Sequence, residues 1–337
     1  MAGGVGHFIL LSTTLGCQDS VEASEGDVST VCNQQVSISP SPAPIQARVV
    51  GYGENTFGGE FDRCRIDLGD SGGGKFDWYV RQFFGHPKTD QSNLGIVADG
   101  SLLMRGPASL NTAAPLPDGG WTGVAFGGGA YFEATLKFDP DEVFFANNVQ
   151  WPSFWSLSVE HLAGLPSEHW AGEALGFKHF AEADFFEYDV WSFAGPLAYG
   201  GATHDWYGEY GRTCLRQYCG VSNAPGGGTH FGNFVVSVPS GNNFNDYHRY
   251  GYLWVPATNS TDGYAQHFFD DVPTGDRIHW SRFENQAPPP GAASWTFGIM
   301  DWQHMVVVLS VGRNQTMSVK SVNIWQSGSA ANWRHRD

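Results

Sequence analysis

Short apolar runs separated by turn residues are the main pattern along most of this chain. From about residue 49 onward, runs rich in Val, Phe, Tyr and Trp lie between clusters of Gly, Pro, Asn and Asp, and they include FDWYVRQFF, AYFEATLKF, FWSLSV, GNFVVSVP, YHRYGYLWV and MSVKSVNIW. Runs of this length and spacing are typical of strands in an all-β sandwich or barrel. No long stretch rich in Ala, Glu, Lys and Leu points to a helical fold.

The run AYFEATLKF shows the strand alternation most clearly. Its polar set and its apolar set fall on opposite faces of a strand: Tyr131, Glu133, Thr135 and Lys137 on one, and Phe132, Ala134, Leu136 and Phe138 on the other. Since successive side chains of a strand point to opposite faces, we expect the apolar face to pack inward. The polar face is then expected to line a groove.

The chain divides into three parts by composition. Residues 1–18 hold a short apolar run before Cys17 without a Lys or Arg ahead of it, an incomplete form of a secretory or lipoprotein signal. Residues 19–48 are polar and proline-bearing, which predicts a linker or a mobile N-terminal arm. Residues 49–330 carry the strand pattern and are expected to form one domain. The apolar run of about 20 residues that a transmembrane helix needs is absent, so no transmembrane segment is expected.

The net charge limits the classes of binding partner, and the cysteines bear on the cellular location. With 18 Lys and Arg against 34 Asp and Glu, the net charge of −16 argues against nucleic acid and against a strongly anionic substrate, whereas a neutral polymer is easily accommodated. If Cys17 is removed or lipidated, an even set remains that could form two disulfides, Cys32, Cys64, Cys214 and Cys219. Free thiols are the alternative. These features favour a secreted or cell-surface protein.

A cluster of acids lies in the apolar stretch AEADFFEYDVW. On a regular strand Glu182 and Asp184 share a face, and Glu187 points to the other. One β-bulge between Asp184 and Glu187 would return Glu187 to the face of the first two acids. Retaining glycosidases use two carboxyl groups about 5 to 5.5 Å apart, one as nucleophile and one as acid/base. The alternative is a solvated acidic strand edge.

Neighbouring segments make the acid cluster resemble a known family. EADFFE resembles the E-x-D-x-x-E signature of family 16 glycoside hydrolases, the laminarinase and endo-β-glucanase group, in its bulged form. GAYFEATLK, WPSFWSLS, DYHRYGYLWVP and QHFFDD resemble further strands of that family in the expected order, over roughly residues 50 to 326. The resemblance implies a concanavalin A-like β-jelly-roll sandwich of two curved antiparallel sheets, with the substrate along the concave face.

The resemblance also implies roles for individual residues. Glu182 would be the nucleophile, Asp184 its electrostatic helper and Glu187 the general acid/base of a retaining, endo-acting hydrolase of β-linked polysaccharide, a β-1,3- or β-1,3/1,4-glucan. The residues expected near the substrate are Trp151, Trp155, His204, Trp206 and His248. No cofactor is required, no catalytic metal is expected because His204 and Asp205 lack a second ligand set at suitable spacing, and a structural calcium is left open.

Several alternatives stay open at this stage. Trp151 and Trp155 could be core residues, and His248 could be a hydrogen-bonded structural histidine. Thr135, Asp271 and the segment CLRQYCGVSNAPGGG depart from the family pattern and leave the polysaccharide undetermined. The same fold could also be a non-catalytic glycan-binding module, a transglycosylase or a galactan hydrolase. The protein is expected to be a monomer.

Overall fold

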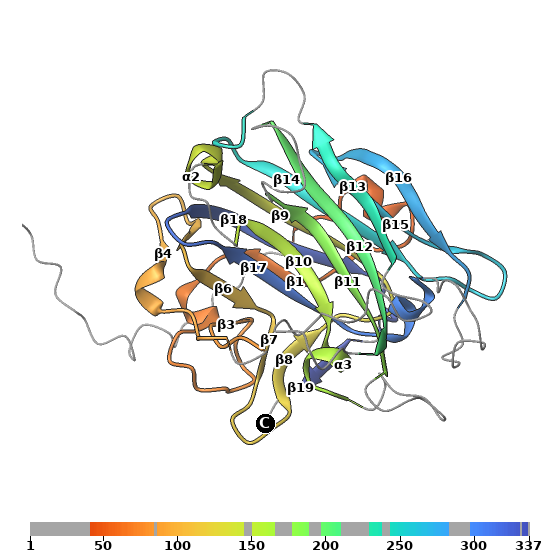
Figure 1. Ribbon diagram of the computed structural model, residues 1–337, viewed down its shortest axis with the longest axis horizontal. Coiled ribbons are helices and arrows are strands. Elements are labelled where there is room, and N and C mark those ends of the chain that lie inside the picture. The colour runs from red at the N-terminus through yellow and green to blue at the C-terminus, as the bar shows by residue number, and fades with distance from the viewer. Residues whose placement is uncertain are drawn as a thin grey trace, which may run out of the picture. The chain divides into compact units, whose positions relative to one another are not determined.

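The computed structural model describes residues 41–83, 86–144, 150–165, 177–188, 197–209, 229–237, 243–282, 297–330 and 332–335. All of them belong to one compact unit, Ile38–Asp337. Nearly every element in these ranges is a β-strand (Figure 1), so the predicted all-β class is confirmed. The few helices are short: α1 (Ile45–Arg48), α2 (Pro140–Phe144), α3 (Val159–Leu162) and the 3₁₀ turns η2 (Arg63–Arg65), η3 (Gln91–Asn93) and η5 (Phe297–Trp302). In the described part of the chain, no helix has the length and apolarity to cross a membrane.

The strands form two large sheets and one small one. Sheet A has the order β16 (Val272–Trp280), β15 (Gly263–Phe269), β14 (His248–Val255), β9 (Ala130–Phe138), β18 (Thr316–Gln326), β5 (Leu102–Arg105), β4 (Leu94–Ile96), and β1 (Glu54–Glu60) also pairs with β18. All of its pairings are antiparallel.

Sheet B carries the acid cluster. Its order is β13 (Thr229–Ser237), β12 (Ala198–Glu209), β11 (Phe177–Glu187), β10 (Ser153–Ser158), β17 (Met305–Val311), β6 (Ala108–Asn111), β3 (Trp78–Tyr79), β2 (Ile66–Asp67). Its pairings are antiparallel except for the short β2–β3 pair. The small sheet consists of β7 (Ala113–Pro115), β8 (Trp121–Ala125) and β19 (Trp333–His335).

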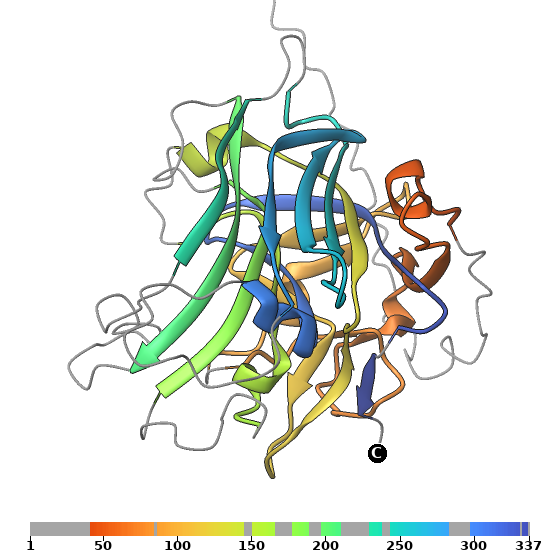
Figure 2. The same cartoon turned by 90° about the vertical axis from the view of Figure 1, so that its right-hand side faces the viewer.

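Sheets A and B are curved and pack face to face through an aromatic core (Figure 2). Phe132 of β9 stacks on Phe185 of β11 with ring centroids 4.8 Å apart, and Phe185 also packs against Tyr252 of β14 at 4.8 Å. Aromatic pairs at this separation contribute beyond the area that they bury. The expected two-sheet sandwich is therefore confirmed, with β11 held against the core by its own phenylalanines.

The outer face of sheet A differs from its prediction. The apolar face of AYFEATLKF packs inward as expected, because Phe132, Ala134, Leu136 and Phe138 belong to the core. The opposite face was predicted to line a groove, but Tyr131 and Glu133 are buried there. The segment around α1 covers this face, since Ala47 and Tyr52 pack in one apolar cluster with Tyr131.

The described chain begins inside the segment predicted to be an arm. Residues 41–48 include α1, where the Gln46 amide donates hydrogen bonds to the Tyr131 hydroxyl (2.8 Å) and to Asp271 Oδ1 (3.0 Å). In Figure 2 this red segment lies on the opposite side of the sandwich from the green strands β11 to β13. Residues 1–18, the rest of 19–48, and Cys32, Cys214 and Cys219 lie outside the described residues, so the signal and the two disulfides stay predictions.

Candidate active site

A β-bulge interrupts β11 at the position that the acid spacing required. Asp184 pairs with Ala202 of β12, whereas Glu187 pairs with Gly200, so three steps along β11 match two along β12. The pairing with β10 shifts at the same place, because Trp155 faces Asp184 and the preceding Phe154 faces Phe186. A bulge of this kind inserts one extra residue and re-aims the side chains that follow it. The predicted bulge is confirmed.

The bulge sorts the side chains of β11 between the two faces of sheet B. Ala181, Ala183, Phe185 and Phe186 all lie in the core. Two consecutive phenylalanines cannot both point inward on a regular strand, but the extra residue of the bulge allows it. Glu182 and Asp184 alternate with the inward residues before the bulge, and Glu187 does so after it. All three acids therefore lie on the outer face of sheet B.

Asp184 is the most enclosed of the three acids. The residue is 1% exposed, and its Oδ2 lies 2.7 Å from Nε2 of His204 on β12. Its Oδ1 is buried and has no hydrogen-bond partner among the described residues. A buried carboxylate with an unpaired oxygen is costly to ionise. Accordingly, burial raises the pKa of Asp184 to about 8.

Glu182 and Glu187 each accept a hydrogen bond from a tryptophan. Nε1 of Trp206 donates to Glu182 Oε2 at 2.9 Å, and Nε1 of Trp151 donates to Glu187 Oε1 at 3.0 Å. Both acids are half-buried, as are both tryptophans. Glu182, Asp184 and Glu187 form a row along β11, which we call the acid row, and the two indoles lie at its opposite ends.

The ionisation of Glu182 is set mainly by its surroundings on this face. Burial, and then the negative charge of Asp184, raise the pKa of Glu182 to about 8, while His204 and the Trp206 indole N–H act in the opposite direction. The charge of Glu187 also raises this pKa, so the three acids interact with one another. A proton is therefore retained within the Glu182–Asp184 pair near neutral pH.

The structure brings most of the predicted substrate-binding residues to the acid row. His204 and Trp206 stack on each other with ring centroids 5.3 Å apart, and half-buried Trp155 pairs across the strands with Asp184. His248 is different: it lies on β14 of sheet A, where Nδ1 is 2.7 Å from Asp270 Oδ2 and Nε2 is 2.9 Å from the Asn243 carbonyl. The structure does not bring His248 together with the acids, and its two ring nitrogens serve structural bonds.

Three of these residues could also hold a metal ion. One ligand atom each from Glu182, Asp184 and His204 lies within 4.8 Å of the others. Carboxylate and imidazole donors together suit a first-row divalent ion such as Zn²⁺. No sequence motif indicates this grouping, because its members come together only across the β11–β12 ladder. The 2.7 Å contact between His204 and Asp184 holds a proton that a metal would have to displace.

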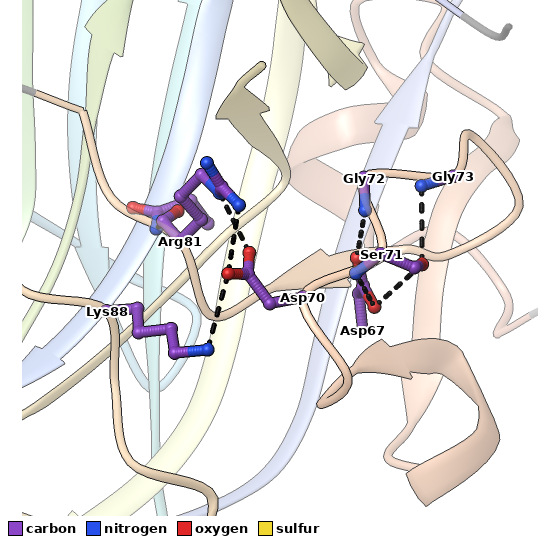
Figure 3. Close-up of polar contacts among 8 residues, drawn as sticks. Asp67, Asp70, Ser71, Gly72, Gly73, Arg81 and Lys88 are labelled. Atoms are coloured by element: carbon purple, nitrogen blue, oxygen red, sulfur yellow. Dashed lines mark hydrogen bonds and ion pairs between the residues drawn. The ribbon is translucent and has the colours of Figure 1, made fainter. Parts of the chain in front are cut away.

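Two acids elsewhere in the molecule have the hydrogen bonds and ion pairs that are typical of a structural carboxylate. At the end of β2 (Figure 3), Asp67 is buried, and its oxygens accept hydrogen bonds from the backbone N–H groups of Ser71 and Gly72 in the following loop. The neighbouring Asp70 meets the Arg81 guanidinium through two bonds of 2.8 and 2.9 Å. Burial raises the pKa of Asp70, but Arg81 and Lys88 outweigh it and leave that pKa below its usual value. Both carboxylates are neutralised or fully bonded, unlike Asp184.

One histidine that no sequence motif indicated contacts the backbone of β11 from the core side. His267 of β15 is 2% exposed, and its Nε2 lies 2.9 Å from the backbone carbonyl oxygen of Asp184. No motif or spacing could have revealed this contact, because the two residues are 83 positions apart and lie in different sheets.

Comparisons with known proteins yield only distant structural likenesses. No protein-family profile and no curated protein matches this chain. Among solved structures, the catalytic domain of an endo-1,3-beta-glucanase (laminarinase) from Thermotoga petrophila RKU-1 is 13% identical, with 82% of this chain and 98% of that chain covered at a TM-score of 0.41. An endo-1,3-beta-glucanase from Streptomyces sioyaensis is 18% identical, covering 85% of this chain and 98% of that one at 0.40. Basic winged bean lectin with Tn-antigen is 10% identical, covering 71% and 90% at 0.30. These likenesses assign neither a family nor an activity to the chain.

Proposed function

We propose that this protein is a retaining, endo-acting glycoside hydrolase that cleaves a neutral β-linked polysaccharide, a β-1,3- or β-1,3/1,4-glucan. The observation that carries the proposal is the bulge in β11, which turns Glu182, Asp184 and Glu187 to one face of sheet B between two tryptophans. A structural acidic edge needs neither the bulge nor the enclosed Asp184. The family resemblance of EADFFE and its neighbouring segments supplies the substrate class.

Glu182 is assigned the role of nucleophile. Its carboxylate would attack the anomeric carbon and form a glycosyl-enzyme, as in double displacement. The Trp206 N–H donates to Glu182 and stabilises its ionised form, which the attack requires. The same bond fixes the direction in which the carboxylate points.

Asp184 is assigned the role of controlling that ionisation. Because Asp184 is the more deeply enclosed acid, it is the better place for the retained proton, which can form a hydrogen bond to Nε2 of His204. A neutral Asp184 removes the nearest negative charge from Glu182, so Glu182 can ionise. Asp184 and His204 therefore act as a proton-holding pair beside the nucleophile.

Glu187 is assigned the role of general acid and base. It would protonate the leaving glycosidic oxygen and then take a proton from the water that releases the glycosyl-enzyme. The reaction uses only carboxyl groups and water, so it needs no cofactor. The aromatic faces of Trp151 and Trp155 suit the flat apolar faces of sugar rings. A polymeric substrate of this kind agrees with the predicted secreted or cell-surface location.

The test is release of reducing ends from a panel of laminarin, mixed-linkage glucan, agarose and carrageenan. The wild-type protein is expected to cleave a β-glucan. The Glu182→Gln variant is expected to show no cleavage, while its circular dichroism spectrum matches that of the wild-type protein. The matched control is Glu133→Gln, since Glu133 is also a buried acid but lies on the covered face of sheet A. Full cleavage by the Glu182 variant would refute the assignment.

Three other outcomes would each indicate a different function. Binding of a glycan without any reducing-end release would indicate a glycan-binding module. Longer products formed when an oligosaccharide acceptor is added would indicate glycosyl transfer in place of hydrolysis, and cleavage of agarose or carrageenan alone would indicate a galactan hydrolase.

A further inference from the structure

A histidine of the opposite sheet forms a hydrogen bond to the bulge in β11 from inside the sandwich. His267 lies on β15 in sheet A, between Ala265 and Phe269, which belong to the core, and its own side chain is buried. Its Nε2 lies 2.9 Å from the carbonyl oxygen of Asp184, the residue at which the register of β11 shifts. A carbonyl oxygen can only accept, so Nε2 carries the hydrogen.

The surroundings of His267 are shaped to admit its ring. Gly201 of β12 lies opposite the bulged residues, between the pairings of Ala202 with Asp184 and Gly200 with Glu187. A Cβ atom at Gly201 would lie only 2.8 Å from Cδ2 and 3.0 Å from Nε2 of His267. The absence of a side chain at Gly201 therefore leaves space for the imidazole to pass over β12 and reach the bulge. Any larger residue there would push the ring away from the Asp184 carbonyl.

The imidazole stays neutral, so it brings no charge to the acid row. Burial lowers the pKa of His267 to about 4, although the bond to the Asp184 carbonyl acts in the opposite direction. Tyr252 packs edge-on against the ring at 4.9 Å, and its hydroxyl lies 2.9 Å from Thr203 Oγ1 in the same layer. His267 is thus a fixed neutral donor rather than a titrating group.

We propose that His267 is a positioning residue that holds the bulge and thereby sets the direction of Glu187 relative to Glu182. Bulged backbone has lost part of its ladder and is free to shift unless another group holds it. A shift at Asp184 moves Glu187, which follows directly after the extra residue, more than it moves Glu182, which precedes it. The inference rests on the proposed function, because it concerns the acid/base step of that reaction.

The experiment compares His267→Phe, which fills the space without a donor, with His267→Gln, whose amide nitrogen can replace Nε2. Tyr252→Phe is the matched control: it removes a buried hydrogen bond in the same layer without touching the Asp184 carbonyl. Each protein is assayed on the polymer and on an oligosaccharide with a dinitrophenyl leaving group, which needs little protonation by Glu187.

For His267→Phe we expect kcat on the polymer to fall about 10- to 100-fold with little change in KM, since misplacement of a catalytic group by about 1 Å has effects of this size. The loss on the dinitrophenyl substrate should be much smaller. His267→Gln should recover most of the polymer activity, and Tyr252→Phe should leave the ratio of the two activities unchanged. Equal losses on both substrates, or the same ratio change in Tyr252→Phe, would overturn the proposal.

Two readouts keep this test separate from that of the proposed function. Nitrogen NMR of the wild-type protein should show His267 as the neutral Nε2–H tautomer at pH 6, and a charged ring or the Nδ1–H tautomer would overturn the proposal. A crystal structure of His267→Phe should show the Glu187 carboxylate displaced, and an unmoved Glu187 would overturn it. If the wild-type protein cleaves no glycan, the proposed function fails, and these two measurements still decide whether His267 holds the bulge.

Discussion

The outer faces of the two sheets each carry buried or half-buried carboxyl groups, but these groups differ in their exposure and in their hydrogen-bond partners. On sheet A, Glu133 is 7% exposed, and burial raises its pKa to about 7 against the lowering effect of Arg249. The Tyr131 hydroxyl donates to Glu133 at 3.3 Å, and the segment around α1 covers Tyr131. On sheet B, Glu182 and Glu187 are only half-buried and accept bonds from half-buried tryptophans.

A raised pKa alone therefore does not mark a reactive carboxyl group. Glu133 has a raised pKa because it is buried beneath the segment around α1. On sheet B, Glu182 and Asp184 have raised pKa values on a face where aromatic side chains flank them and where Asp184 Oδ1 lacks a partner in the described part of the chain. The combination of partial exposure, aromatic flanks and mutual interaction distinguishes a candidate site from a buried structural acid.

The largest expected effect separates the two faces by activity. Glu187→Gln should lower kcat on the polymer by about 10² to 10⁴-fold, because general acid–base catalysis contributes that much. Initial rates of reducing-end release measure the loss. Glu133→Gln, tested in parallel, should keep nearly full activity, and an equal loss in both variants would remove the distinction between the faces.

The next effect concerns stability against pH. The folded-state pKa of Asp184 is raised from 3.8 to about 8, so between these values the folded protein holds a proton that the unfolded chain has released. The free energy of unfolding therefore falls as pH rises through this window, and Asp184→Asn removes that fall. Between pH 4 and pH 8 we expect the stability of the variant to rise by about 5 kcal/mol relative to that of the wild-type protein. Urea unfolding at both pH values checks this, and parallel pH dependences would contradict it.

A smaller effect tests the cover on sheet A. Gln46→Ala removes the bonds to Tyr131 and Asp271 and should lower the free energy of unfolding by about 1 to 2 kcal/mol. Thermal unfolding measures the loss. Activity should not change, because the segment around α1 lies on the face opposite the acid row. A marked loss of activity at unchanged stability would show that the two faces are coupled.

The smallest effect is a shift in the pH dependence of the reaction. Trp206→Phe removes the N–H that stabilises ionised Glu182, so the pKa of Glu182 should rise further. Since the nucleophile must be ionised, the ascending limb of the kcat profile should move up by about half to one pH unit. Trp280→Phe is the control, because its indole donates to Asp301, which is not part of the acid row. An unshifted limb in Trp206→Phe would argue against Glu182 as the nucleophile.

Much of the fold could be predicted because strand periodicity is local. The alternation in residues 130–138 assigned the inward face correctly, since each apolar side chain two residues apart points the same way. The fate of the other face could not be predicted from that strand, because its cover comes from residues 41–52, far away in the sequence. The assumption of a polar groove failed for that reason.

For the site as well, the features that depend on nearby residues could be predicted, and the contacts between distant strands could not. The spacing of Glu182, Asp184 and Glu187 required a bulge, and the consecutive phenylalanines between them need the same bulge to reach the core. His204 was associated with the site through its neighbouring segment, but its contact with Asp184 forms only across the ladder. His248 was associated in the same way, yet the sandwich places it on the other sheet with partners of its own.

Features that depend on neighbours along the chain could be predicted from local sequence: the strands, their inward faces and the need for a bulge in AEADFFEYDVW. Packing of the two sheets, in contrast, sets which carboxyl groups are buried, which hydrogen-bond partners they have, and the contact of His267 with the Asp184 carbonyl across the core. The physical reason is that periodicity acts over a few residues, whereas burial and hydrogen bonding join atoms from strands that are distant in sequence. Burial among those distant strands raises the pKa values of Glu182 and Asp184, and hydrogen-bond partners on β12 orient their carboxyl groups.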